Sequence, residues 1–296
     1  MFCKIIKITL INIIFILCVF ILLENIIIWS KFYIPRICEV SENDRVENTL
    51  EYNKNKKSII VAGCSFTYGS GILFNENISY KLQQKTKRKV YNRGIPAWGP
   101  NANLKDIQTT SFFNNHKIIE PEYYIYTFIS DHLRRIYINY WDTDFSNEIY
   151  NFYKIRNNEL ILRNKINLLD YIQITQVMKR INRRIFDLTP DDKKFDRLKL
   201  YLYTMRSELI KRYPNIKMVI LVYNTDLDTV YTHQIKPFKT ERWKELEDDG
   251  FILLRFDTPE FEFLADNKYI SEFDNVHPNG KAWDIIVPII IKKLGL

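Results

Sequence analysis

The sequence SIIVAGCSFTYG, residues 58–69, joins a short apolar run to a turn that carries a serine between two glycines. The run from Ser58 to Ala62 is typical of a buried strand. Glycine permits a sharp backbone turn, which would lift the Ser65 hydroxyl clear of the sheet. We therefore expect Ser65 to stand at the end of the first strand of an α/β domain.

A second segment, Asp274-Asn275-Val276-His277-Pro278, lies more than two hundred residues further along the chain. A serine hydroxyl is a poor nucleophile at neutral pH unless an imidazole removes its proton, and that imidazole needs an acceptor on its other nitrogen to fix its tautomer. His277 can be the base and Asp274 the acceptor. Together the two segments predict a serine hydrolase with Ser65 as its nucleophile.

The two segments resemble the first and last sequence blocks of the SGNH, or GDSL-like, hydrolases, which are G-D-S-x-T-x-G and D-x-x-H-P. Cys64 replaces the aspartate of the first block, at a position beside the nucleophile that is not the triad acid. The segment 91–99 looks like the second block, in which a glycine N–H joins the oxyanion hole. Gly94 is the matching residue.

The third block, G-x-N-D, would follow the strand expected at Tyr123–Ile129, where this chain has Ser130-Asp131-His132 and no asparagine. In the family that asparagine is the third oxyanion donor, and loss of one such donor costs about 10²–10³ in rate. The resemblance thus implies an oxyanion hole of Ser65 and Gly94, with Ser130 or His132 as the third donor.

The resemblance covers residues 58–296, with distinctive residues only in the four blocks. It implies a three-layer α/β/α sandwich around a parallel sheet of about five strands in flavodoxin-like order. The residue pattern agrees, because strands and helices alternate along the chain. Further strands are expected at Val90–Tyr91, Tyr123–Ile129, Lys217–Tyr223 and Phe251–Phe256, and helices at Ser79–Lys85, Ala102–Phe113, Asp192–Tyr213 and Gly280–Leu294.

Each end block also has a simpler interpretation. A glycine and a serine after a strand more often form an ordinary turn than a nucleophile. The second segment could equally be a helix N-terminus, with Asp274 as the cap and Pro278 near the first turn. The order of the segments, with a strand before the first and a helical stretch after the second, favours a catalytic site.

An insertion at about residues 137–190 interrupts the alternation of strands and helices and is the expected lid or acceptor-binding element, because loops at strand ends surround the sites of such sheets. Its aromatic residues could stack on sugar rings, although a small hydrophobic core is the simpler interpretation. They include Tyr137, Tyr140, Trp141, Tyr150, Phe152 and Tyr153.

The N-terminal segment, residues 1–30, has the pattern of a membrane anchor. No charge occurs from Ile8 to Leu23, and Lys4 and Lys7 precede that run. A helix of about 20 apolar residues spans the hydrocarbon core, and the basic flank favours a cytoplasmic N-terminus. A cleaved signal peptide is the alternative, but no small-x-small cleavage pattern follows. We expect a single-pass anchor, a linker at 31–57 and a C-terminal domain that is periplasmic or otherwise extracytoplasmic.

The composition narrows the classes of partner. The net charge of +8 comes from basic residues scattered among acidic ones, with no motif of a nucleic-acid module, so no nucleic-acid binding is expected. Basic segments such as 54–57 and 85–89 could attract anionic lipid or an acidic glycan, with a solvated surface as the default. His116 and His233 lack metal-ligand spacing, and no phosphate or dinucleotide fingerprint occurs, so no metal or cofactor is expected.

These patterns predict a membrane-anchored serine esterase. Because the anchor would place the domain outside the cytoplasm, the expected substrate is an acylated glycan, with an O-acetyl group on a surface polysaccharide removed or transferred. A lipid esterase is the alternative within the same chemistry. A catalytically inactive glycan-binding or assembly protein is the alternative of another class, and the replacements at Cys64 and Ser130 favour it.

Overall fold

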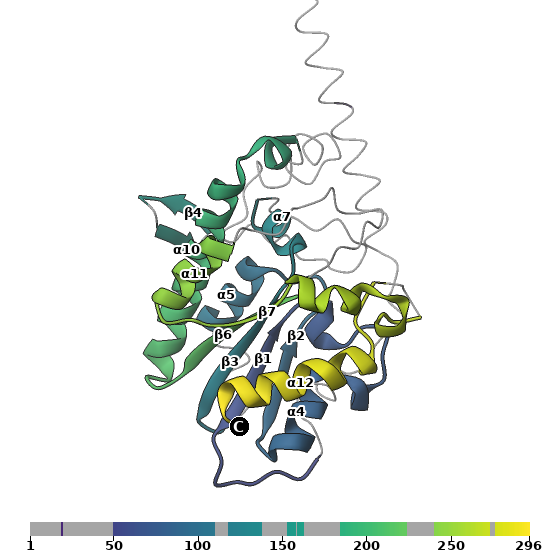
Figure 1. Ribbon diagram of the computed structural model, residues 1–296. Helices are drawn as coiled ribbons and strands as arrows, with labels where there is room; N and C mark the ends of the chain where they lie inside the picture. Colours follow the sequence, from purple (N-terminus) through teal and green to yellow (C-terminus); the bar gives the residue numbers. More distant parts are fainter. Residues whose placement is uncertain are drawn as a thin grey trace, which may run out of the picture.

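A parallel sheet of five strands forms the centre of the computed structural model (Figure 1). The structure describes residues 50–109, 118–137, 153–157, 159–162, 184–223, 240–272 and 276–296, together with Val19. The strands are β1 (Ser58–Gly63), β2 (Val90–Gly94), β3 (Pro121–Phe128), β6 (Lys217–Tyr223) and β7 (Ile252–Phe256). Their order is β2-β1-β3-β6-β7, which confirms the predicted flavodoxin-like arrangement.

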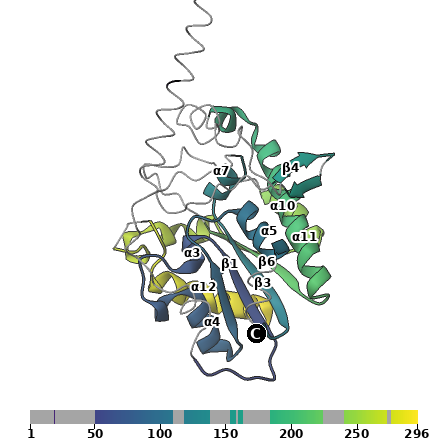
Figure 2. The ribbon, with the colours of Figure 1, turned by 180° about the vertical axis from the view of Figure 1, so that it is seen from behind.

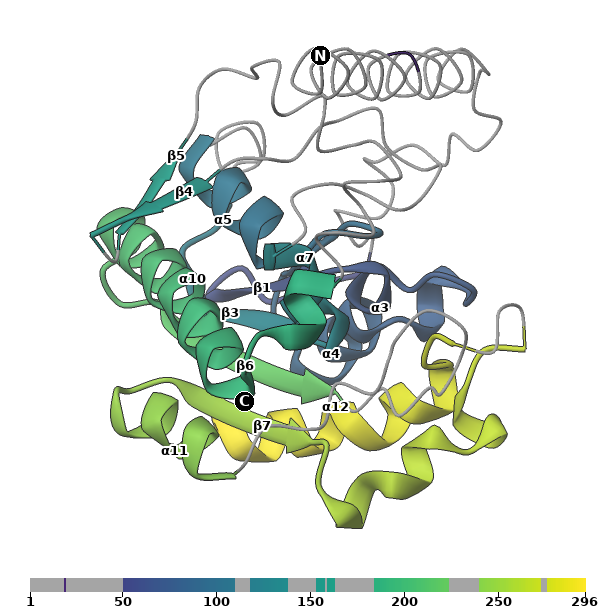
Figure 3. The same ribbon diagram turned by 90° about the horizontal axis from the view of Figure 1, so that it is seen from above.

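Two helical layers enclose the sheet, as predicted. One face is covered by α4 (Ile78–Thr86) and α12 (Gly280–Leu294), and the other by α5 (Pro100–Thr109), α10 (Asp191–Arg212) and α11 (Thr240–Asp248). Seen from above, α10 and α12 lie on opposite sides of β6 (Figure 3). Strands of a parallel sheet that is covered on both faces are apolar throughout, and all six residues of β1 are buried.

Alternation along β3 divides the core in two. Tyr124, Tyr126 and Phe128 belong to the cluster beneath α5, α10 and α11, whereas Tyr123 and Ile125 belong to the cluster beneath α4 and α12. Successive side chains of a strand point to opposite faces, so one strand serves both clusters. His132 contacts aromatic rings of the first cluster, and His277 contacts Phe66 of the second.

Short elements connect these layers at the carboxyl ends of the strands. The short helix α3 (Ser65–Tyr68) follows β1 directly and stands at its upper end in Figure 2. The others are η1 (Phe74–Glu76), α7 (Asp131–Tyr137), η2 (Pro259–Ala265) and η3 (Asn267–Tyr269). The helix α12 has the predicted bounds, and its N-cap is Asn279, whose side chain accepts the N–H groups of Lys281 and Ala282. The cap role considered for Asp274 therefore falls to Asn279, which directly precedes the helix.

Part of the predicted insertion is described. The antiparallel hairpin of β4 (Tyr153–Arg156) and β5 (Glu159–Leu162) lies against α10. Tyr153 is buried and its hydroxyl donates to Gln108, while Tyr137 stacks edge-on against Phe186. For these two tyrosines the interpretation as a hydrophobic core holds. Tyr140, Trp141, Tyr150 and Phe152 lie outside the described residues.

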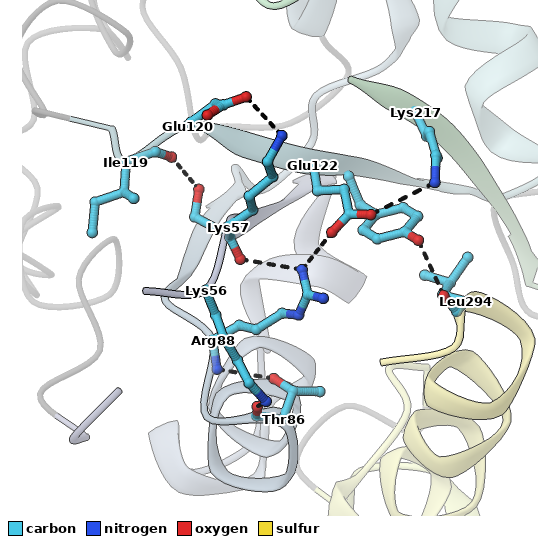
Figure 4. Close-up of polar contacts among 11 residues, drawn as sticks. Lys56, Lys57, Thr86, Arg88, Ile119, Glu120, Glu122, Lys217 and Leu294 are labelled. Atoms are coloured by element: carbon cyan, nitrogen blue, oxygen red, sulfur yellow. Dashed lines mark hydrogen bonds and ion pairs between the residues drawn. The ribbon is translucent and has the colours of Figure 1, made fainter. Parts of the chain in front are cut away.

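The basic segments directly precede β1 and β2, so they lie at the amino ends of these strands, and Ser65 follows the carboxyl end of β1. Figure 4 shows polar contacts of Lys56, Lys57 and Arg88 at this end. Lys57 pairs with Glu120 at 2.8 Å, and Arg88 and Lys217 both pair with Glu122, at 2.6 and 3.6 Å. Glu120 and Glu122 therefore neutralise part of the positive charge at this end.

The predicted anchor, residues 1–30, lies outside the described residues except for Val19. Within the part of the chain that the structure describes, no helix has both the length and the apolar character needed to cross a bilayer.

Candidate active site

The structure brings Ser65 and His277 together. The Nε2 atom of His277 lies 2.7 Å from the Oγ atom of Ser65, although the two residues are 212 positions apart in the chain. Ser65 begins α3 at the carboxyl end of β1, and His277 lies just before α12. Both side chains are only half-buried, so a substrate can reach them. This distance is a hydrogen bond, the geometry that base activation of a serine requires.

The turn that presents Ser65 depends on Gly63. Residues other than glycine rarely adopt its φ of +149°. An added Cβ would also lie 2.6 Å from the Oγ1 atom of Thr67. The same Thr67 hydroxyl donates to the carbonyl of Ala62 at 3.3 Å. The glycine thus lets α3 fold back against the end of β1.

A buried asparagine on β2 holds α3 from the other side. The Nδ2 atom of Asn92 donates to the carbonyl of Thr67 at 3.0 Å and to the hydroxyl of Ser79 at 3.2 Å. Ser79 in turn donates to Asn77, the N-cap of α4. This network links β2, α3 and α4, and among the described residues only the Nδ2 atom of Asn77 in it has no hydrogen-bond partner. Sequence analysis missed Asn92, since nothing local distinguishes its side chain.

Gly94, the predicted oxyanion donor, lies against α3. An added Cβ at Gly94 would lie 2.3 Å from the backbone nitrogen of Tyr68 and 2.6 Å from the carbonyl carbon of Thr67. Its N–H donates to the Oδ1 atom of Asn92 at 2.9 Å, and the next N–H, of Ile95, donates to the carbonyl of Gly63 at 3.2 Å. The structure therefore requires a glycine at this position for close packing, and it gives the N–H of that glycine a partner within the protein.

The segment that carries His277 is held by a short backbone pairing. The N–H of Ser271 donates to the carbonyl of His277 at 2.7 Å, and Ile270 forms a bridge with Pro278. The imidazole packs against the ring of Phe66, with centroids 5.0 Å apart. Asp274, the predicted third member of the triad, lies outside the described residues, so its role stays a prediction.

The two candidates for the third oxyanion donor, Ser130 and His132, differ in burial. Ser130 is half-buried between β3 and α7, at the carboxyl end of β3. His132 is fully buried, with Nδ1 2.8 Å from the Tyr126 hydroxyl and its ring edge-on to Phe128. Its neighbours belong to the cluster opposite the one that His277 contacts. Burial, assisted by Arg135, lowers the pKa of His132 well below its usual range, so this imidazole is neutral.

Asp131 has a structural role that sequence analysis did not identify. Its carboxylate accepts hydrogen bonds from Arg134 at 2.6 Å and from Arg135 at 2.7 Å, and Arg135 also donates to the carbonyl of Trp98 at 2.7 Å. Burial alone would raise the pKa of Asp131, but the charges of Arg135 and Arg134 outweigh burial and hold that pKa well below its usual range. The spacing of an aspartate three and four residues before two arginines was the available signal.

Two further features border the site. Cys64 is a buried free thiol whose pKa is raised by burial, which makes it an unreactive packing residue. Gly71, Ile72, Leu73 and Glu76, in the loop after α3 and in η1, line a shallow pocket of about 370 Å³. No cluster of three or more potential metal ligands occurs among the residues that the structure describes.

No protein-family model and no curated protein matches the chain. Several solved structures are similar to it at low identity. A protein assigned to the G-D-S-L lipolytic family, from Desulfitobacterium hafniense DCB-2, is 11% identical, with a TM-score of 0.45 over 80% of this chain and 99% of that one.

Two carbohydrate esterases are similar to the same degree. A catalytic mutant of the acetylxylan esterase Axe2 from Geobacillus stearothermophilus is 11% identical, with a TM-score of 0.43 over 84% of this chain and 97% of that one. A family 3 carbohydrate esterase from Clostridium thermocellum is 12% identical, with a TM-score of 0.43 over 80% and 94%. Because the sequence identities and TM-scores are this low, the activity of the chain has to be inferred from its own residues.

Gly94→Ala is expected to displace α3, because the new methyl group would overlap the backbone at Thr67 and Tyr68. Overpacking of this kind costs about 1–3 kcal/mol of the free energy of unfolding, which chemical denaturation measures. Gly295→Ala is the comparison: a Cβ there meets no atom within 4 Å, so this variant loses only what the positive φ of +66° costs a residue with a side chain. Equal stability losses in the two variants would contradict the close packing of Gly94 on α3.

Asp131→Asn should make stability less dependent on pH. Because the folded-state pKa of Asp131 is depressed, its ion pairs stabilise the fold above the unfolded pKa of about 3.9 and lose that effect as pH falls towards the folded value. We expect the variant to be less stable by about 2 kcal/mol at pH 7, with the difference shrinking below about pH 4. Denaturation at several pH values measures this, with Asp284→Asn, at an exposed ion pair, as the control. A difference that stays constant with pH would contradict the assignment.

Proposed function

We propose that this chain is a serine esterase of the cell envelope that removes or transfers O-acetyl groups on a surface glycan. The observation that carries the proposal is the 2.7 Å contact between the Ser65 hydroxyl and the His277 imidazole. The contact joins a nucleophile and a base at the carboxyl end of a parallel sheet, where the sites of open α/β sheets form. Both residues remain accessible to a substrate.

In the proposed reaction the Oγ atom of Ser65 attacks the ester carbonyl carbon, and Nε2 of His277 takes the hydroxyl proton. The tetrahedral intermediate collapses as His277 returns that proton to the departing alcohol, which leaves an acyl-enzyme on Ser65. Water, or a sugar hydroxyl in a transfer reaction, then attacks the acyl group with His277 again as the base. Asp274 would hold the imidazole in the productive tautomer throughout.

The oxyanion would be bound by donors at the ends of β1, β2 and β3. The N–H of Ser65 lies in the first turn of α3, where a helix offers no internal partner. The N–H of Gly94 can contribute by sharing its bond to Asn92. Ser130 is better suited than His132 as the third donor, because Ser130 is half-buried and His132 is fully buried.

The envelope location rests on the N-terminal sequence. The uncharged run from Ile8 to Leu23, preceded by Lys4 and Lys7, supports an anchor with the C-terminal domain outside the cytoplasm. Esters accessible to a domain tethered there are those of envelope glycans and lipids. The half-buried pair of Ser65 and His277 leaves access for a small acetyl ester on a sugar, and a lipid ester is the alternative substrate.

A catalytically inactive glycan-binding protein is the second candidate. Two observations favour it: the N–H of Gly94 is already paired with Asn92, and Ser130 stands where the family has its oxyanion asparagine. A site with fewer oxyanion donors would bind an acetylated sugar without cleaving it. The two candidates differ in whether Ser65 is activated.

Covalent labelling of the full chain with a fluorophosphonate probe separates the two candidates. An activated serine should react, and labelling should be lost in Ser65→Ala and fall by at least about 10³ in His277→Ala, because the base is removed. Ser70→Ala, which removes a neighbouring half-buried hydroxyl, should label normally. Absence of labelling in the folded full chain would favour the binding protein. Comparing acetyl with long-chain esters then decides between glycan deacetylation and lipid hydrolysis.

The proposed anchor has its own test. The full chain should stay in the membrane fraction after an alkaline carbonate wash and dissolve in detergent. A double variant, Ile14→Arg with Leu17→Arg, should move to the soluble fraction, because each charge at a helix centre costs about 2.5–3.5 kcal/mol of insertion free energy. Finding the unaltered chain in the soluble fraction would refute the anchor.

A further inference from the structure

Ser271 lies between the two segments that form the proposed site. It follows η3 and is 3% exposed. Its N–H donates to the carbonyl of His277 at 2.7 Å. Its hydroxyl donates to the carbonyl of Gly71, also at 2.7 Å, in the loop that follows the nucleophile helix α3. Ser271 is therefore hydrogen-bonded both to the histidine segment, residues 276–279, and to the serine loop, residues 69–73.

Other backbone contacts hold the histidine segment to the region around η3. The bridge between Ile270 and Pro278 and the bond from the Asn279 N–H to the Tyr269 carbonyl pair the histidine segment with residues around η3. They fix the shape of that region without connecting it to the serine loop. The ring contact between Phe66 and His277 does join the two sides, but apolar packing tolerates sliding of one surface over the other. The hydroxyl of Ser271 adds a directional constraint.

Such a constraint matters because base catalysis depends on short distances. A displacement of about 1 Å between reacting groups can cost about 10²-fold in rate. Ser65 and His277 sit on different elements, each at a chain turn, so their separation depends on how these turns are held together. A hydrogen bond from a buried side chain to the Gly71 carbonyl restricts that separation.

We propose that Ser271 is a positioning residue that sets the distance between the Ser65 hydroxyl and the His277 imidazole. The assignment of its catalytic effect rests on the proposed esterase function. Ser271 acts through the backbone carbonyls of Gly71 and His277 and does not itself touch the reacting atoms.

The test compares Ser271→Ala with Ser58→Ala in the full chain. Ser58 is an equally buried serine whose hydroxyl donates to the Ile119 carbonyl at the opposite end of β1. Both variants remove one buried hydroxyl bonded to a backbone carbonyl, so both should lower the thermal unfolding midpoint by a similar amount. Only Ser271→Ala should lower kcat for an acetyl ester, by about tenfold, with KM within about twofold.

A conservative variant and a structural measurement sharpen the test. Ser271→Thr keeps the hydroxyl and should retain a higher kcat than Ser271→Ala. In crystals of Ser271→Ala the distance from Ser65 Oγ to His277 Nε2 should exceed about 3.5 Å, whereas Ser58→Ala should keep the hydrogen bond. Equal kcat values for Ser271→Ala and Ser58→Ala, or an unchanged distance in Ser271→Ala, would overturn the positioning role. If the unaltered chain cleaves no ester, the proposed function fails, and the crystallographic distance alone decides whether Ser271 positions the pair.

Discussion

The burial of β1 on both faces is the constraint from which the rest of this structure follows. All six of its residues are buried between two helical layers, with β2 on one side and β3 on the other. The chain crosses from β1 to β2 on one side and then to β3 on the other, so the connections leave the sheet in opposite directions at this point. The loops diverge there and leave room for a site. Ser65 stands at this divergence because it directly follows β1.

Polar contacts fix the loops around that point. Asn92 ties α3 to the end of β2 and to the N-cap of α4, and Asp131 with Arg135 ties α7 to the carbonyl of Trp98. Each contact is buried or nearly so, where a satisfied hydrogen bond gains strength and an unsatisfied group is costly. The apolar layers therefore set the topology, and these few polar contacts set the positions of the reactive segments.

The same contacts bear on whether the site reacts. The Asn92 side chain that orders α3 also takes the N–H that the family resemblance assigns to the oxyanion hole. The N–H of Gly94 would therefore be shared between Asn92, which orders α3, and the oxyanion of the proposed reaction. The half-buried Ser130, at the carboxyl end of β3, is the residue through which the site could recover a donor. In the proposed esterase, the number of oxyanion donors would depend on the balance between Asn92, Gly94 and Ser130.

The sequence by itself determined the parallel α/β sandwich, its strand order, the bounds of α12 and the candidate pair Ser65 and His277. The elements and the candidate pair followed from local patterns of apolar residues, glycine turns and short blocks, which act over a few neighbouring residues. The strand order followed from the resemblance of those blocks to the SGNH hydrolases. Only the tertiary structure decided that Gly94 packs on α3 with its N–H paired, that His132 is buried away from His277, and that Ser271 links the two segments. Each of these depends on contacts between residues distant in the chain, and such contacts exist only once the layers have packed.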